Sequence, residues 1–321
     1  QYGLAKQIGV SNVEAEEFLN SYFLKFIIYL IFVICCYNIF NIMKSYLLFL
    51  SLYFSFFCFS AKLDKFTYDL WDKPNLDVYY HLPETINENT KVLFVIHGNS
   101  RNADNYLETW IKLAKDKNYA IFAPHFKRSQ FISFNTLQMS TSSGRIRDDA
   151  NLYLNNSIDL LFDYINPVFN LNQKSYDIYG HSAGAQFVHR YLLFSDNPQV
   201  NKAVAANAGW YTFLDGSNFP YGISNPPIEF NSQNVINFLN MDLHIHIGSA
   251  DTDISSSVNQ SEGANNQGLN RFQRANNFFG YTTKIVEENG LNYNWSFLVV
   301  DGVAHSNSRM SKAAAEVIFV N

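Results

Sequence analysis

Short apolar runs alternate with longer amphipathic stretches along residues 61–321. Runs such as KVLFVI at 91–96 are rich in Val, Ile and Leu, which is typical of strands buried on both faces of a sheet. Strands are predicted at 66–71, 76–82, 91–96, 119–123, 175–179, 203–206, 243–247, 282–287 and 294–300. Apolar residues at helical spacing predict helices at 104–116, 148–165, 186–194, 270–279 and 310–319.

This alternation predicts an α/β fold, because strands that alternate with helices form a mostly parallel sheet with helices on both faces. No internal repeat divides 61–321, so we expect one catalytic-size domain. Residues 124–158 form a long polar stretch, which predicts a surface loop before a helix. Two further segments, 207–230 and 255–268, break the pattern, and we expect these roof segments to cover a ligand site.

The first 60 residues carry a different pattern. Residues 26–42 are almost continuously apolar, and Met43-Lys44 opens a second apolar run that ends in small residues before Ala61. A basic residue, an apolar stretch and small residues make the layout of a secretory signal peptide, so we predict one at 43–60. A secreted or periplasmic location follows if translation starts at Met43. The alternative is a membrane anchor formed by residues 24–59, since apolar stretches of about 20 residues span a bilayer.

Residues 1–26 contain the run YGLAKQ and then a helical pattern that ends in Tyr22-Phe23. This segment resembles the part of family A DNA polymerases that follows the fingers helix. No palm carboxylates follow it, so it implies no polymerase activity. We therefore expect 1–42 to be an extraneous segment, a polymerase-like fragment plus an apolar spacer. A signal peptide at 43–60 and a catalytic domain at 61–321 would follow it.

Charge and cysteine content exclude several classes of partner and site. The formal net charge is −5, and no cluster of Lys and Arg appears, which argues against nucleic acid as a partner. The cysteines are Cys35, Cys36 and Cys58, all before residue 61. The predicted domain therefore has neither a disulfide nor a thiolate metal site, and we expect no metal and no cofactor.

The run Gly180-His181-Ser182-Ala183-Gly184 follows a predicted strand and precedes a predicted helix. This G-x-S-x-G pattern is typical of a sharp strand-to-helix turn that exposes a serine hydroxyl. Small flanking residues are needed because the strained turn leaves no room for a Cβ. Ser182 is therefore the predicted nucleophile.

A serine hydroxyl needs an adjacent base, and that base needs a carboxylate to orient it. On this type of sheet both partners follow the serine in the chain, the acid before the histidine. His305 follows the strand predicted at 294–300 and a glycine turn, and it is the predicted base. Asp251 follows the strand at 243–247 and is the preferred acid. Asp253 and Asp215 are alternatives, although each also fits a turn or capping role.

The transition state of acyl transfer carries a negative oxygen that needs two backbone N–H donors. We expect Ala183, directly after the nucleophile, to provide one donor. Asn99, in the loop after KVLFVI, is expected to provide the other. Arg101 in the same loop could orient a substrate carboxylate or brace the loop. Aromatic residues of the first roof segment, Trp210 and Tyr211 above all, are candidates for a substrate-binding wall.

Together, HGNSRNA at 97–103, GHSAG at 180–184, GSAD at 248–251 and GVAH at 302–305 resemble the α/β-hydrolase superfamily. Within it the sequence is most similar to the polyhydroxybutyrate depolymerase and feruloyl-esterase-like branch. The resemblance covers about 85–320 and implies a Ser182, Asp251, His305 triad with Asn99 and Ala183 as oxyanion donors. Secreted depolymerases of that branch often carry disulfides and polymer-binding modules, which 61–321 lacks.

We therefore expect a serine hydrolase that cleaves a small-molecule or oligomeric ester. Two alternatives stay open. One is a serine peptidase on the same fold, which would normally bring a large extra domain. The other is a binding protein that uses the fold without catalysis, although a nucleophile, an acid, a base and an oxyanion loop are all present in the sequence.

Overall fold

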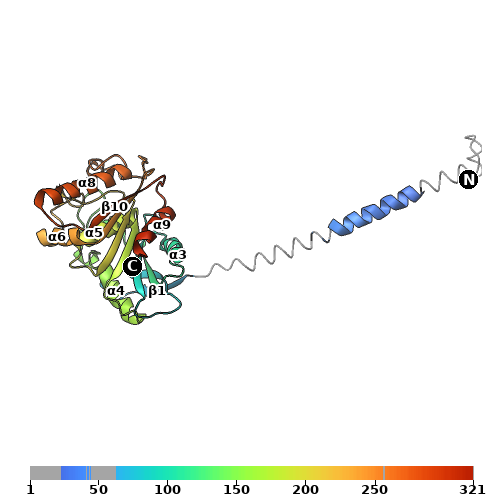
Figure 1. Cartoon of the computed structure of the whole chain (residues 1–321), viewed down its shortest axis with the longest axis horizontal. Coiled ribbons are helices and arrows are strands. Elements are labelled where there is room, and N and C mark those ends of the chain that lie inside the picture. The colour runs from blue at the N-terminus through green and yellow to red at the C-terminus, as the bar shows by residue number, and fades with distance from the viewer. Residues whose placement is uncertain (1–22, 41, 43, 45–62, 256, 321) are drawn as a thin grey trace, which may run out of the picture. The chain divides into compact units, whose positions relative to one another are not determined.

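The computed structural model describes residues 23–40, 42, 44, 63–255 and 257–320. The chain divides into two units, residues 1–62 and 63–321. In the first unit, the helix Phe23–Phe40 is long and apolar enough to cross a membrane (Figure 1). Its mean hydropathy is 2.2, and none of its residues is buried. Apart from Lys44, the predicted signal peptide at 43–60 lies outside the described residues, as does most of the polymerase-like segment.

The second unit is built on an eight-stranded sheet. The two outermost pairings on one side, β1 with β2 and β2 with β4, are antiparallel, and all the others are parallel. The predicted mostly parallel sheet is therefore confirmed. In sheet order the strands are β1 (Asp64–Tyr68), β2 (Leu76–His81), β4 (Tyr119–His125), β3 (Lys91–Ile96), β5 (Tyr176–His181), β6 (Val200–Ala206), β9 (Leu243–Gly248) and β10 (Trp295–Val300).

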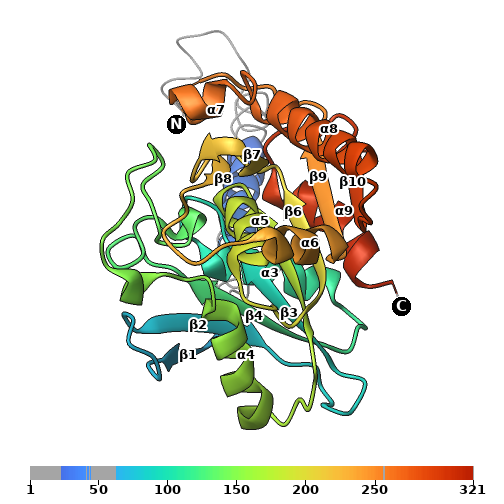
Figure 2. The ribbon, with the colours of Figure 1, turned by 90° about the vertical axis from the view of Figure 1, so that its left-hand side faces the viewer.

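Helices cover both faces of this sheet (Figures 1 and 2). One face carries α3 (Ala103–Leu113) and α9 (Asn307–Ile318), and the other carries α4 (Ser157–Val168), α5 (Ala183–Phe194), α6 (Ser232–Asn240) and α8 (Arg271–Asn289). Strand β3 shows why both faces are apolar. Leu93 and Val95 pack into the α3 and α9 side, whereas Phe94 and Ile96 pack into the α5 side. A strand buried in this way must be apolar along its whole length.

The structure corrects the prediction of a strand at 282–287, because these residues continue α8. The buried residues Phe278, Thr282 and Val286 are spaced four apart, so they form one helical face. The β-branched residues in 282–287 predicted a strand. Instead, Thr282 and Val286 pack on the buried face of a helix. The helix ends at Gly290, which adopts φ 60.

Other differences lie in segments that the sequence showed as loops. Within 124–158 there are two short 3-10 turns, and α4 begins at Ser157 rather than at 148. The first roof segment contains a two-stranded sheet of β7 (Phe213–Asn218) and β8 (Gly222–Ser224). The second contains the four-residue helix α7 (Glu262–Asn265), and α6 was not predicted. These elements are short, so their periodicity is too brief to recognise.

Candidate active site

Ser182 lies at the junction of β5 and α5 with φ 59 and ψ −118, a backbone conformation that residues other than glycine rarely adopt. Its N–H donates to the carbonyl of Ala206 at 2.9 Å, which holds the turn against the neighbouring strand. A Cβ added at Gly180 would lie 2.3 Å from the Gly184 carbonyl oxygen. One at Gly184 would lie 2.2 Å from the Ile96 carbonyl oxygen. The two glycines are thus required by close backbone approach.

His305 and Asp251 complete a chain of hydrogen bonds that starts at Ser182. The Nε2 atom of His305 lies 2.9 Å from Ser182 Oγ, and its Nδ1 atom lies 2.7 Å from Asp251 Oδ2. A carboxylate can only accept, so Nδ1 of His305 carries the hydrogen and donates to Asp251. Nε2 is then free to accept from the Ser182 hydroxyl. The His305 side chain is 29% exposed, whereas that of Asp251 is 1% exposed. The predicted acid is thus shielded from solvent, and the predicted base is partly exposed.

The two alternative acids lie elsewhere. Asp253 is exposed and accepts hydrogen bonds from Ser255 and Ser257. These bonds lower the pKa of Asp253 to about 2, and none of them involves a histidine. Asp215 lies on β7 and accepts from the Ser217 N–H at 2.9 Å. Of the three candidate acids, Asp251 alone contacts His305 in the described structure.

Asn207 joins the end of β9, which precedes Asp251, to the loop that precedes His305. It was not among the residues predicted from the sequence. This buried residue follows β6, and its Oδ1 accepts from the Gly248 N–H at 2.9 Å. Its Nδ2 donates to the Ala304 carbonyl at 3.2 Å. A Cβ at Gly248 would also lie 2.1 Å from the Val303 carbonyl oxygen. A polar residue directly after a parallel strand was the available signal, because ligand sites lie at such strand ends.

Arg271 is a second residue that the sequence did not reveal. Its Nη1 lies 3.2 Å from Asp251 Oδ1, so this carboxylate has a partner on each oxygen. Nη2 of Arg271 donates to the Ser257 carbonyl at 3.0 Å. The arginine side chain is only 5% exposed, and a buried ion pair with good geometry fixes both groups. Asp251 therefore cannot rotate away from His305 without breaking this pair.

His181 packs against the base. The rings of His181 and His305 are 4.7 Å apart, and His181 Nδ1 lies 3.0 Å from the hydroxyl of Tyr106. Burial, with a smaller contribution from the charges of His305 and Arg271, holds the pKa of His181 well below its usual value. His181 is therefore neutral at physiological pH, and it supplies a fixed surface for the base.

The loop after β3 approaches the nucleophile. A Cβ added at Gly98 would lie 3.5 Å from the Cβ of Ser182, so the loop backbone passes beside the serine. In the described part of the chain, the N–H groups of Asn99 and Ala183 have no hydrogen-bond acceptor. Free N–H groups beside a nucleophilic serine are what an oxyanion hole needs. Both expected donors are thus available for that role.

Three residues expected to bind substrate are buried. Arg101 is 8% exposed, and its guanidinium donates to the carbonyls of Phe126, Phe131 and Ile132. This favours the bracing role that the sequence left open. Trp210 is 2% exposed and lies over the Arg190 guanidinium, while Tyr211 is fully buried against Phe278. The positions of Arg101, Trp210 and Tyr211 thus give no support to their assignment as substrate-binding residues.

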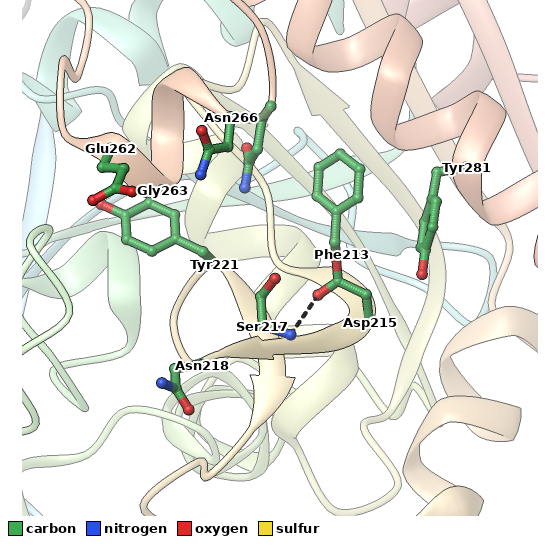
Figure 3. Close-up of a pocket in the computed structure, with 10 residues that line it drawn as sticks. Phe213, Asp215, Ser217, Asn218, Tyr221, Glu262, Gly263, Asn266 and Tyr281 are labelled. Atoms are coloured by element: carbon green, nitrogen blue, oxygen red, sulfur yellow. Dashed lines mark hydrogen bonds between the residues drawn. The ribbon is translucent and has the colours of Figure 1, made fainter.

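A cavity of about 480 Å³ opens between the roof segments and α8 (Figure 3). Phe213 and Tyr281 lie together on one side of it, and Tyr221 and Glu262 lie on the other. Asp215 adds a second carboxylate, and no Lys or Arg lines this cavity. Ser182, Asp251 and His305 do not line it either. Two aromatic residues of the first roof segment, Phe213 and Tyr221, thus line an acidic cavity whose lining does not include the serine.

Comparisons with known proteins give no match to a family model and none to a curated protein. Several solved structures are similar over most of the chain. Poly(aspartic acid) hydrolase-1 from Sphingomonas sp. KT-1 is 33% identical, with a TM-score of 0.75, over 80% of this chain and 98% of that protein. The chain belongs to the α/β-hydrolases.

The second structure is the poly(3-hydroxybutyrate) depolymerase LpqC from Bordetella parapertussis. It is 25% identical, with a TM-score of 0.73, over 81% of this chain and 90% of that protein. The predicted resemblance to the depolymerase branch of the α/β-hydrolases is therefore confirmed. The S-formylglutathione hydrolase FrmB from Staphylococcus aureus shares the fold at 16% identity and a TM-score of 0.51, over 80% of this chain and 97% of that protein.

Proposed function

We propose that this α/β-hydrolase cleaves carboxylic esters through an acyl-enzyme formed on Ser182. The observation that carries the proposal is the continuous hydrogen-bond chain from Ser182 Oγ through His305 to Asp251, with distances of 2.9 and 2.7 Å. His305 Nε2 takes the hydroxyl proton as Ser182 Oγ attacks the ester carbonyl carbon. Asp251 stabilises the imidazolium that forms, and Arg271 keeps this carboxylate in place.

The tetrahedral intermediate places its negative oxygen between the N–H groups of Asn99 and Ala183. Ala183 begins α5, so the positive end of the helix dipole adds to its N–H. The imidazolium of His305 then gives its proton to the leaving alcohol, and the C–O bond of the ester breaks. In the second half of the reaction His305 deprotonates a water molecule, which attacks the acyl-enzyme and releases the acid. Ser182 recovers its proton in this step.

The substrate proposed is a small-molecule or oligomeric ester. In support, one similar structure is named as a depolymerase of poly(3-hydroxybutyrate), a polymer joined by ester bonds. A second candidate is amide cleavage by the same triad, in line with the peptidase alternative. It is favoured by the 33% identical protein named for poly(aspartic acid), whose units are joined by amide bonds.

Export is a further part of the proposal. The layout of Met43-Lys44, an apolar run and small residues supports a signal peptide at 43–60. The apolar helix Phe23–Phe40 supports the alternative of a membrane anchor. N-terminal sequencing of the expressed protein separates the two. A start near Ala61 supports cleavage and export, whereas a retained 23–40 segment in the membrane fraction supports an anchor.

The test of the proposed function is the Ser182→Ala variant assayed on 4-nitrophenyl butyrate and on a matched 4-nitroanilide. We expect wild-type turnover of the ester and a loss of at least about 10³-fold in kcat for the variant, since removing the nucleophile removes acyl-enzyme formation. Ser308→Ala, at an exposed position in the first turn of α9, is the matched control and should keep its activity. Faster cleavage of the anilide would favour the amide candidate. Unchanged ester turnover in Ser182→Ala would contradict both.

A further inference from the structure

Two arginines contact or belong to the loop after β3, which carries Asn99 and is called the oxyanion loop below. Their surroundings differ. Arg101 is buried and donates to the carbonyls of Phe126, Phe131 and Ile132. Arg128, in the turn after β4, is exposed, and its Nη2 donates to the carbonyl of Asn99 at 2.8 Å. The Asn99 side-chain Oδ1 lies 3.4 Å from the same nitrogen. The arginine that is open to solvent is therefore Arg128.

The charge of Arg128 is not neutralised. Within the described part of the chain no Asp or Glu lies within ion-pair distance of it. Its neighbour Lys127 differs, because Lys127 Nζ lies 2.8 Å from Asp77 Oδ2. Burial, and after it the positive charge of Arg128, lowers the pKa of Arg101 to about 10. Two cations thus stand side by side at this loop without an intervening carboxylate.

Arg128 contacts the loop that is proposed to bind the carbonyl oxygen of the substrate. Its guanidinium is bound to Asn99, whose N–H is a proposed oxyanion donor, and the preceding Gly98 packs beside Ser182. A guanidinium has five N–H donors in a planar fork, and the contact with Asn99 uses one nitrogen. Arg128 is exposed, so the rest of its fork is accessible from solvent next to the loop that carries Asn99. A planar fork of this kind matches a carboxylate.

We propose that Arg128 forms a subsite for a carboxylate carried by the acyl part of the substrate. This inference rests on the proposed function and narrows its substrate class to esters or amides of acids that bear a second carboxylate. The cavity described above carries two carboxylates, Asp215 and Glu262, and no Lys or Arg lines it, so it would repel such a group.

The test compares mono-4-nitrophenyl adipate with 4-nitrophenyl hexanoate, which has the same chain length without the carboxylate. For Arg128→Gln we expect kcat/KM on the adipate ester to fall about 10-fold, because a charge-assisted hydrogen bond is lost. The hexanoate ester should lose clearly less, because the substitution costs it only the contact of Arg128 with the Asn99 carbonyl. The difference should shrink at 1 M salt, because the site is exposed. Arg128→Lys keeps the charge but loses the fork and should fall between the wild type and Arg128→Gln.

The control is Lys115→Gln, which removes one exposed positive charge before β4, at the opposite edge of the sheet. It should leave both esters unchanged. An equal loss of both esters in Arg128→Gln would overturn the proposal and make Arg128 a brace of the oxyanion loop. Unchanged kinetics on both would overturn it as well.

A binding measurement separates this inference from the proposed function. Calorimetry of Ser182→Ala with monoethyl adipate needs no turnover, and we expect weaker binding when Arg128→Gln is added to that variant. Equal binding by the single and double variants would contradict the subsite. Absence of hexanoate turnover by the wild type would instead contradict the ester hydrolysis proposed above.

Discussion

The edge of the sheet that carries Ser182, formed by the carboxyl ends of its strands, and the roof segments at 207–230 and 255–268 differ in how far direct backbone contacts hold them. At the sheet edge, backbone packs directly on backbone, as at Gly184 against Ile96 and at Gly248 against Val303. In the roof segments, buried arginine side chains bind loop carbonyls. Arg274 donates to the carbonyls of Gly209, Asn259 and Gly268, each at 2.8 Å.

Arg190 on α5 is a second buried arginine, and it binds the first roof segment through the side chain of Thr212. Its Nε donates to Thr212 Oγ1 at 3.0 Å, and its Nη1 donates to the Asn135 carbonyl at 2.8 Å. Burial lowers the pKa of Arg190 to about 9. A sheet edge fixed by backbone contacts keeps its geometry when a surface side chain changes. A roof fixed by single guanidinium groups should respond strongly to one substitution.

The largest effect should separate Asp251, which contacts His305, from Asp253, which contacts the start of the second roof segment. Asp251→Asn removes the charge that stabilises the His305 imidazolium, and kcat should fall about 10³- to 10⁴-fold. Asp253→Asn removes only contacts with Ser255 and Ser257, and kcat should stay within about 3-fold. Steady-state kinetics on 4-nitrophenyl butyrate checks both. Equal losses would place Asp253 in the catalytic chain and contradict the assignment.

The next effect concerns stability of the roof. Arg274→Met leaves the carbonyls of Gly209, Asn259 and Gly268 without their donor in a buried site, so the free energy of unfolding should fall by about 2–4 kcal/mol. Arg309→Met, on the exposed side of α9, is the matched control and should stay within about 0.5 kcal/mol. Urea unfolding followed by circular dichroism measures both. Equal stabilities would mean that the guanidinium does not hold the roof.

The smallest effect uses one histidine from each region. His97 Nε2 accepts the Phe126 N–H at 3.1 Å at the sheet edge, and His189 Nε2 accepts the Thr212 N–H at 3.1 Å beneath the roof. Burial lowers the pKa of His97 to about 3 and holds the pKa of His189 well below its usual value. Protonation at Nε2 would break either bond.

Both histidines therefore stay neutral in the folded state, while the unfolded chain takes up protons below about pH 6.5. Stability should be full above that pH and fall as the pH decreases toward 3, by up to about 1.4 kcal/mol per pH unit for each group. Urea unfolding at pH 7 and pH 5 measures this loss, and His97→Gln and His189→Gln should each reduce it. A stability that does not change between these pH values would contradict the buried neutral state of both.

The sequence predicted the elements around Ser182 better than those of the roof segments, because the pattern around Ser182 lies within a few consecutive residues. The turn at Ser182 needs small residues within five positions, so its pattern is visible without knowledge of the fold. Asp251 and His305 could be placed because each follows a strand in the order that the fold requires. The strand predicted at 282–287 was wrong because its β-branched residues serve the buried face of α8.

The residues that the sequence did not reveal depend on distant partners. Arg271 binds Asp251 from the start of α8, and Asn207 joins Gly248 to the loop before His305. Arg101 and Arg128 each lie in a loop shortly after a strand, β3 and β4 respectively. Which one is buried depends on where the carbonyls of 126–132 lie in space, and no local pattern encodes that.

The measurement that tests the central claim most directly is covalent labelling with a fluorophosphonate probe, followed by peptide mass spectrometry. The phosphorus is attacked by an activated serine, and fluoride leaves. We predict one adduct on the folded wild-type protein, on Ser182, and a labelling rate that falls strongly in His305→Ala because the base is removed. An unlabelled Ser182 in correctly folded protein, or a labelling rate that does not change in His305→Ala, would contradict the account.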